Sequence, residues 1–304
     1  MDKGKNIYWL MVLAALFWAG AFIAGKFAVP YIPTFTLTFL RFFFASLVLF
    51  FLTAAARRKE GGKAFRLKRE HVPVFLFTGI VGMFGYHVFF FIALKYTTAI
   101  NSSIIGAMNP IVTTIIAALF LRAKIPGRQA VGIALSFIGV VLTISGASWQ
   151  TLSSMSFNRG DLWMLAAVVC WAAYGVFSKS KGSKIPPFWL TYYSFLVCTL
   201  ILIPFAVWEK PWRILGEIPA AGWIAVLYMS IFASVGGYLI QQIAIKRIGP
   251  SRTSIFINLV PVFSMALAVL ILGETLEPVK LATAGIIIAG VCICQLSGRG
   301  EEKG

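Results

Sequence analysis

Ten long apolar runs constrain the fold of this chain more than any other feature of its sequence. Each run is roughly 18 to 25 residues long, the length of a helix that crosses the hydrocarbon core of a membrane. The runs lack the alternation of apolar and polar residues that marks the strands of a membrane barrel. Only 12% of the residues are charged, against about 25% in a soluble domain. We therefore predict an all-α polytopic membrane protein.

The predicted spans form two sets of five helices. The first set comprises Ile7–Val29, Thr34–Ala56, Val72–Leu94, Ala99–Leu121 and Gln129–Ser145. The second set comprises Asp161–Ser178, Pro187–Trp208, Ala220–Ile245, Ser251–Leu272 and Pro278–Leu296.

Motifs recur between the two sets. Trp18, followed by Lys26, matches Trp171, followed by Lys179, at an offset of 153 residues. Self-similarity of this kind is the signature of an internal repeat. The predicted organisation is a five-helix repeat at residues 1–146, a loop at 147–160, a second five-helix repeat at 161–297 and a tail at 298–304.

An odd number of spans in each repeat places the second repeat upside down relative to the first. Basic segments tend to stay on the cytoplasmic side of a membrane. With the amino terminus inside, the cytoplasmic segments hold 20 Lys and Arg residues and the outside segments hold 6, with Arg41 left within the second span. We predict an inner-membrane protein with both termini in the cytoplasm. Inverted repeats place a site near the bilayer midplane that opens alternately to either side, which favours a transporter.

The net charge of +17 does not by itself indicate nucleic-acid binding. Basic residues sit mostly between or beside the apolar runs, with no basic stripe interleaved with exposed aromatic residues, so topology and lipid headgroups explain the charge. The four cysteines lie inside apolar runs, and Cys292 and Cys294 point to different sides of a helix. We expect membrane lipids and a small-molecule substrate as partners, no nucleic acid, no metal and no cofactor, in either a monomer or a homodimer.

Polar and aromatic residues deep in the spans are site candidates, because polar groups in hydrocarbon are costly unless they face protein or water. His87, beside Tyr86, lies near the centre of the third span. An offset of 151 pairs His87 with Tyr238 and Phe90 with Gln241, so matched turns of the third and eighth spans carry polar or aromatic groups. We favour a pathway-lining role for His87 over that of a satisfied histidine between helices.

Two pairs of aromatic residues occupy equivalent spans. Trp18 and Phe22 share one face of the first span, and Trp171 and Tyr174 form a similar pair in the sixth. Tryptophans that only anchor a helix prefer the membrane interfaces, whereas these two lie in mid-span. Pocket lining and core packing are equal alternatives for both pairs.

Two prolines and one arginine lie inside predicted spans. Asn109-Pro110 and Asn258 with Pro261 occupy the middle of the fourth and ninth spans. Because proline bends a helix and frees a backbone carbonyl, we expect kinks at both positions that serve either gating or packing alone. Arg41 lies about two turns inside the second span. We expect it to snorkel to the interface or to cap carbonyls, with contact to an anionic substrate group as the alternative.

None of the ten Asp and Glu residues lies near the middle of a span. Proton or sodium coupling through a buried acid therefore has no evident carrier, which favours a facilitator and leaves coupling through His87 or backbone carbonyls open. The spans contain no Asp in mid-membrane, and His87 has no obvious nucleophile beside it in the sequence. We therefore predict that the chain is not an enzyme.

Short motifs in both halves point to one family. Those of the first half are Trp18-Ala19-Gly20-Ala21-Phe22 with Lys26, Pro33, Leu40-Arg41, Ala93-Leu94-Lys95-Tyr96-Thr97 and Asn109-Pro110. Those of the second half are Trp171-Ala172-Ala173-Tyr174 with Lys179, Pro261 and Leu272-Gly273-Glu274. Together they resemble EamA-type transporters of the drug/metabolite transporter superfamily over nearly the whole chain. The resemblance implies a ten-helix basket whose central cavity is lined by spans one, three, four, six, eight and nine, and export of amino acids or other small metabolites.

The resemblance extends to single residues. Tyr86, His87 and Trp171 are similar to cavity residues of the aromatic amino acid exporters in this family. The first repeat departs from the family pattern at Leu121-Arg122-Ala123, where the usual Gly-Glu is missing. We therefore expect its cytoplasmic turn to be built differently.

We predict a transporter that exports amino acids or similar small neutral or zwitterionic metabolites through a central cavity, by alternating access and without ion coupling. Aromatic walls with few charges suit such ligands. The candidate substrate-binding residues are Trp18, Phe22, Tyr86, His87, Phe90, Asn109, Trp171, Tyr174, Tyr238, Gln241 and Asn258, and the candidate gating kinks are Pro110 and Pro261. The alternatives are export of sugars, nucleosides, drugs or phosphorylated sugars, the last requiring several deep cations at one cavity, or an intramembrane enzyme.

Overall fold

The computed structural model describes residues 5–59, 67–122, 125–153, 157–248, 253 and 256–297. Helices form the secondary structure of these residues, and no β-strand occurs among them. Eight helices in the described part are long and apolar enough to cross a membrane. The last two predicted spans coincide with shorter apolar helices, Leu259–Leu272 and Pro278–Cys294. The predicted all-α membrane fold is confirmed, with eight candidate spans.

The helices follow the predicted spans closely, and their ends differ by a few residues at most places. The first half contains α1 (Lys5–Ala28), α2 (Thr34–Lys59), η1 (Arg69–His71), α3 (Val72–Phe77), η2 (Thr78–Gly85), α4 (Tyr86–Tyr96), α5 (Ala99–Gly106), α6 (Asn109–Leu121), α7 (Gly127–Ser145) and α8 (Trp149–Ser153). The second half contains α9 (Arg159–Lys181), α10 (Pro187–Trp208), η3 (Pro211–Arg213), α11 (Ala220–Tyr228), η4 (Met229–Gly236), α12 (Gly237–Ile248), α14 (Leu259–Leu267), η5 (Ala268–Leu272) and α15 (Pro278–Ser297).

Local sequence explains several helix ends. The side chain of Thr98 accepts a hydrogen bond from the backbone N–H of Asn101 at 3.0 Å and caps the start of α5. Asn158 caps α9 in the same way, through the N–H of Gly160 at 2.7 Å. Gly273 ends η5 with a φ of 66°, where a residue without a Cβ has no steric penalty.

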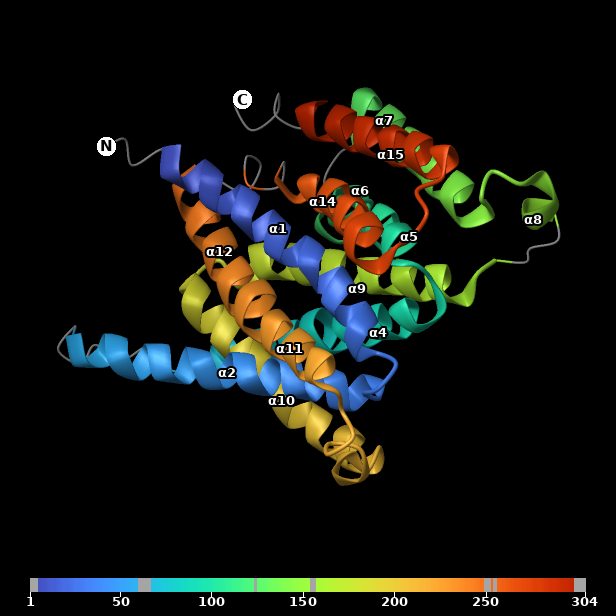
Figure 1. The fold of residues 1–304 in the computed structure, drawn as a ribbon. Coiled ribbons are helices and arrows are strands. Elements are labelled where there is room, and N and C mark those ends of the chain that lie inside the picture. Colours follow the sequence, from blue (N-terminus) through green and yellow to red (C-terminus); the bar gives the residue numbers. More distant parts are fainter. Residues whose placement is uncertain are drawn as a thin grey trace.

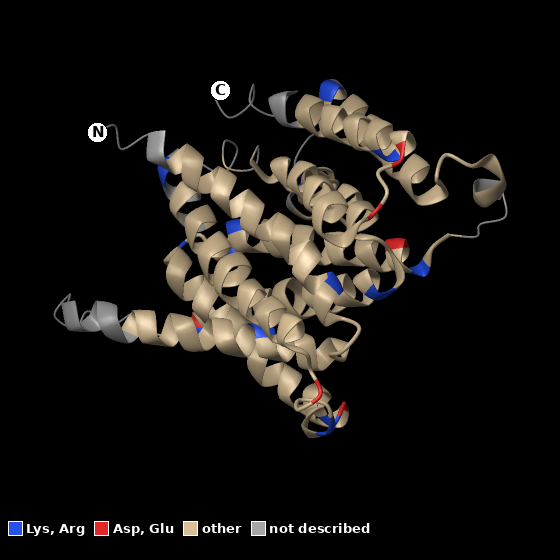
Figure 2. Cartoon of the chain, in the orientation of Figure 1, with Lys and Arg blue, Asp and Glu red and all other residues tan. Residues whose placement is uncertain are grey.

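Helices from the two halves are interleaved in space (Figure 1). α1 of the first half packs on α11, α12 and α14 of the second, while α9 of the second half packs on α4, α5 and α6 of the first. The α7–α15 pair lies at one edge of the bundle and the α2–α10 pair at the opposite edge. Charged residues lie mainly near helix ends and in connecting segments (Figure 2). The bundle centre is therefore built by both halves and is largely apolar.

Small residues bring α7 and α15 into close contact. A Cβ atom on Gly132 of α7 would lie 2.5 Å from the carbonyl oxygen of Gly290 on α15. Ser136, one turn further along α7, donates to the carbonyl of Ile287 at 3.1 Å. This close approach matches the small-residue packing common between membrane helices.

Irregular helical segments recur at equivalent places in the two halves. The π-helices η2 and η4 are related by the predicted offset of 151 residues. Each directly precedes a stretch of candidate site residues, and π-helical segments are frequent at functional sites. The fourth predicted span is interrupted by a turn at Ala107 and Met108 before Pro110, and α14 follows a turn at Asn258 before Pro261. The regular helical structure is therefore interrupted just before both prolines.

Candidate functional site

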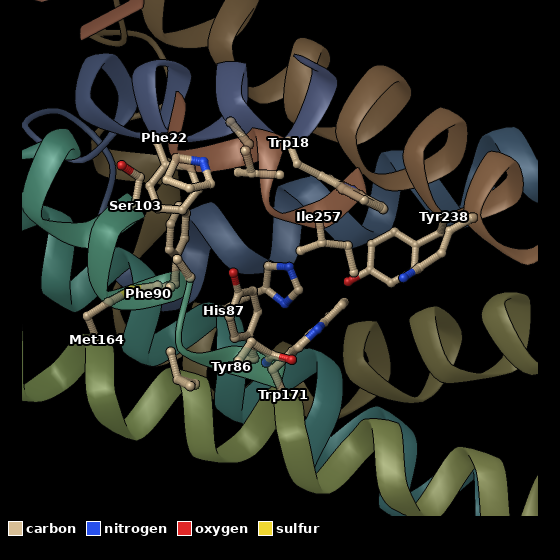
Figure 3. Close-up of a pocket in the computed structure, with 18 of the residues that line it drawn as sticks. Trp18, Phe22, Tyr86, His87, Phe90, Ser103, Met164, Trp171, Tyr238 and Ile257 are labelled. Carbon is tan, nitrogen blue, oxygen red and sulfur yellow. The ribbon is translucent and has the colours of Figure 1, made fainter. Parts of the chain in front are cut away.

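A cavity lies between helices of the two halves (Figure 3). It holds about 770 Å³ of space free of protein atoms, a volume that includes open solvent. Its lining residues are Trp18, Ala21, Phe22, Arg41, Tyr86, His87, Phe90, Ser103, Gly106, Ala107, Asn109, Met164, Val168, Trp171, Tyr238, Gln241, Ile257, Val260 and Pro261. They come from the six spans that the family resemblance implies and, through Arg41, from α2.

The structure brings most of the candidate binding residues together. Those that line the cavity are Trp18, Phe22, Tyr86, His87, Phe90, Asn109, Trp171, Tyr238 and Gln241. Pro261 also lines it, whereas Pro110, Tyr174 and Asn258 do not. Tyr174 lies behind the wall, because Gly82 of η2 leaves room for its ring beside Trp171, with 5.2 Å between the two ring centroids. Asn258 is buried at the turn that precedes α14.

Sequence reasoning missed several apolar lining residues, since nothing in their type separates them from ordinary core. Met164 and Val168 lie seven and three residues before Trp171. Residues at this spacing share one face of a helix, and that periodicity could have identified both as lining residues. Gly106 and Ala107 lie where the fourth span is interrupted. Glycine has no side chain and alanine has only a methyl group, so both leave space open at this turn.

Six aromatic side chains line the cavity in a continuous series. Neighbouring ring centroids are 6.3 Å apart for Trp18–Tyr238, 5.5 Å for Tyr238–Trp171, 4.9 Å for Trp171–Tyr86, 5.9 Å for Tyr86–Phe90 and 5.0 Å for Phe90–Phe22. Phe22 lies one turn from Trp18 on α1, so the series returns to its starting helix. Rings in these offset and edge-to-face arrangements form a rigid apolar surface.

His87 supplies a polar group to this aromatic wall, and its ring lies among the labelled cavity side chains (Figure 3). Its Nδ1 atom lies 2.8 Å from the carbonyl oxygen of Met83. A carbonyl only accepts, so Nδ1 carries the proton, and Nε2 of the neutral ring is a hydrogen-bond acceptor. The ring is held edge-on by Phe42 and Tyr86, with centroids 4.7 and 4.6 Å away. His87 is therefore oriented by its neighbours before any ligand arrives.

Arg41 is the cation of the cavity lining, and its position corrects the sequence-based expectation. Its side chain is 3% exposed and does not snorkel to an interface. Within the described part of the chain it also caps no carbonyl: Nε donates to the hydroxyl of Ser234 on η4 at 2.9 Å, and Nη1 lies 3.9 Å from the sulfur of Met229. The expectation was wrong because η4 packs against α2 and gives the guanidinium a partner inside the bundle.

The sequence itself carries a family signature over this whole bundle. The model of the EamA-like transporter family matches residues 5–145 and, a second time, residues 158–295. The chain belongs to the EamA-like transporter family. With its candidate spans, this EamA-like transporter is a multi-pass membrane protein.

Relatives of this EamA-like transporter carry transporter names. The "Uncharacterized transporter YyaM" of Bacillus subtilis is 33% identical, over 95% of this chain and 93% of the relative. A "Probable amino-acid metabolite efflux pump" of Salmonella typhimurium is 28% identical, over 93% of each chain. A solved structure titled "Crystal structure of protein" is 20% identical, with a TM-score of 0.63 over 97% of this chain and 99% of the other. This last likeness shows a shared fold.

Two carboxylates of this EamA-like transporter join its halves at one end of the bundle. Glu209, after α10, accepts hydrogen bonds from the backbone N–H groups of Phe35 and Thr36 at 3.1 and 2.7 Å. Glu274, after η5, accepts from the N–H groups of Ala99 and Ile100 at 2.8 and 3.0 Å. Both satisfy the free donors at the starts of first-half helices, α2 and α5, where a negative charge is favourable.

The same end of this EamA-like transporter carries further polar contacts. Lys26 donates to the carbonyls of Leu94 and Thr97 at 3.0 and 2.7 Å, and Thr97 donates its hydroxyl to the buried carboxylate of Asp161. Within the described residues no three His, Cys, Asp or Glu side chains gather to hold a metal ion. The polar side chains at this end of the bundle thus form hydrogen bonds that connect the ends of helices.

Proposed function

We propose that this EamA-like transporter exports amino acids or similar small neutral or zwitterionic metabolites across the inner membrane, through the central cavity, by facilitated alternating access. The observation that carries the proposal is one cavity whose aromatic wall is contributed by both halves (Figure 3). Such a wall suits a ligand with an apolar body, and His87, Asn109 and Gln241 offer it hydrogen bonds. A phosphorylated sugar is a poorer match, because Arg41 is the one cation among the described lining residues.

The proposed architecture is a ten-helix bundle of two inverted repeats, at residues 1–146 and 161–297. The 151-residue offset between the π-helices and between the interrupted helices supports it. Both termini are cytoplasmic in this proposal, as the excess of Lys and Arg in the corresponding segments indicates. A pseudo-twofold axis in the membrane plane then passes near the cavity, which suits a site that faces each side in turn.

In this topology the end at which Glu209 and Glu274 cap α2 and α5 faces outward. Opening to the outside requires both carboxylates to leave the helix starts that they cap, so these contacts stabilise the state that is closed outside. At the offset of 151 their counterparts are Arg58 and Ala123, which carry no carboxylate. The two ends therefore differ, and we infer that the resting protein faces the cytoplasm, ready to load substrate for export. The breaks near Pro110 and Pro261 are the proposed points of bending.

Facilitated transport is supported by the composition of the cavity. No Asp or Glu occurs among the described residues that line it, so an acid that would carry a coupling proton or sodium ion is missing from that lining. His87 donates through Nδ1 to a backbone carbonyl and acts in this proposal as a hydrogen-bonding group. Transport then follows the concentration gradient of the substrate alone.

The test is transport of a panel of labelled amino acids in proteoliposomes, with and without an imposed pH gradient. We expect amino acids to equilibrate without the gradient, and Trp171→Ala and His87→Ala to abolish the movement while reaching the membrane at the parent level. Trp208→Ala is the matched control, because that tryptophan is 74% exposed at the end of α10. Absence of any amino-acid movement, or accumulation that needs the gradient, would refute the proposal.

A further inference from the structure

We propose that Arg41 binds a carboxylate of the substrate, so that the transported molecule is an organic monocarboxylate with an apolar body. The inference rests on the proposed function, since it assigns the chemical class of ligand to the same cavity. Arg41 lies in the cavity lining and is 3% exposed.

The hydrogen-bonding groups of Arg41 are only partly satisfied by the protein. A guanidinium has five N–H donors and stays protonated in proteins. Nε uses one donor on Ser234, and Nη1 faces the sulfur of Met229, a weak acceptor, at 3.9 Å. The described residues offer no acceptor to Nη2. The side of the guanidinium that carries Nη2 is therefore free to form the paired hydrogen bonds that a carboxylate makes with arginine.

The charge of Arg41 also lacks a carboxylate partner in the described part of the chain. The described Asp and Glu residues nearest to the ends of the cavity-lining helices are engaged elsewhere: Glu209 and Glu274 cap α2 and α5, and Asp161 binds Thr97. The rings of Phe42 and Phe91 lie 5.8 and 6.0 Å from the guanidinium carbon and offset part of the burial cost. A buried cation without a counter-ion is costly, and an anionic ligand removes that cost.

The surroundings of Arg41 favour one carboxylate rather than a phosphate. Tyr86 and Tyr238 line the same cavity as Arg41, and their hydroxyls have no hydrogen-bond partner among the described residues, so they can donate to a carboxylate oxygen. A doubly charged phosphate group would need further cations, which the described lining does not contain. His87 Nε2 is an acceptor and suits an ammonium group on the same ligand.

Ser234 positions the guanidinium. It is fully buried on η4, and among the described residues its hydroxyl is the oxygen to which Arg41 donates a hydrogen bond. Through this hydrogen bond, Ser234 of η4 in the second half contacts α2 of the first half. We expect Ser234→Ala to loosen the orientation of the fork without removing its charge.

The experiment uses four probes that share one ring: phenylalanine, phenylalaninamide, 2-phenylethylamine and 3-phenylpropionate. Each is measured as a stabiliser of the purified transporter against heat in detergent and as a competitor of labelled phenylalanine in proteoliposomes. We expect the two carboxylates to bind the parent at least tenfold more tightly than the amide and the amine, as a charge-assisted pair would give. In Arg41→Gln this preference should fall at least tenfold, and in Ser234→Ala by a smaller factor.

Arg213→Gln is the matched control, because this arginine is exposed in η3, outside the cavity, and it should keep the parental preference. Two results overturn the inference: equal binding of phenylalanine and its amide by the parent, or an undiminished carboxylate preference in folded Arg41→Gln. If Arg41→Gln does not fold, the inference is tested by the carboxylate preference of the parent and by its reduction in Ser234→Ala. If amino acids fail but 3-phenylpropionate binds in an Arg41-dependent way, the amino-acid proposal falls and this inference stands.

Discussion

The indole N–H of Trp18 donates to the backbone carbonyl of Ala233 at 3.1 Å, joining α1 of the first half to the π-helix η4 of the second. The same tryptophan stands edge-to-face with Tyr238, with 6.3 Å between ring centroids. The one hydrogen-bond donor of this side chain is therefore used within the protein, and its apolar ring lines the cavity. One side chain thus links the two halves at the wall of the proposed binding site.

Gly237 makes this link possible, and its substitution provides the first prediction. A Cβ atom there would lie 2.5 Å from Nε1 of Trp18. We expect Gly237→Ala to displace the indole and to lower stability by about 1 to 3 kcal/mol, as overpacking does, measured by unfolding in detergent. Gly285→Ala on α15 is the control, since a Cβ atom there meets nothing within 4 Å. Equal stability of the two variants would show that Trp18 adjusts freely.

Loss of the Glu274 cap should favour opening to the outside. A helix cap contributes about 0.5 to 2 kcal/mol, so Glu274→Ala should raise the open fraction by roughly two- to thirtyfold. The measurement is labelling of Ser103→Cys, a cavity position, by a membrane-impermeant maleimide added outside, in a background without other cysteines. Glu277→Ala is the control, because that carboxylate pairs with Lys280 at 3.6 Å in the same region. An unchanged labelling rate in Glu274→Ala would contradict the proposed outer closure.

His87→Phe separates hydrogen bonding from packing at the cavity wall. Phenylalanine keeps an aromatic ring against Phe42 and Tyr86 but lacks both nitrogen atoms. We expect amino-acid transport to fall at least about tenfold while the amount of membrane protein stays normal. His71→Gln is the matched control, since the second histidine lies in η1, away from the cavity. If His87→Phe transported amino acids at the parental rate, His87 would not be a substrate-binding residue.

Packing of the α7–α15 pair should affect stability and leave selectivity intact. A side chain on Gly290 would overlap the hydroxyl of Ser136 on α7. We expect Gly290→Leu to destabilise the protein by about 1 to 3 kcal/mol, read as a lower yield and earlier thermal unfolding. The competition profile of the folded fraction should match the parent, because neither helix contributes a residue to the described cavity lining. A changed profile would mean that this pair takes part in substrate choice.

The positions of the helices could be predicted from sequence because span length and hydrophobicity depend on local composition. α10 begins at Pro187 and ends at Trp208, as predicted. The offset of 151 residues likewise relates η2 to η4 in the structure. Deep polar and aromatic residues such as His87 and Trp171 could be proposed as site residues, because burying them in lipid without a role is costly.

The direction of individual side chains was decided only by the tertiary structure. Arg41 points toward Ser234 because η4 packs on α2, and no local pattern in α2 records that neighbour. Tyr174 lies behind the cavity wall because Gly82 of η2, far away in the chain, leaves room for its ring. Sequence alone determined which segments are helical and apolar, since those properties are local. Which face of each helix meets the cavity depends on long-range packing, and only the assembled bundle specifies it.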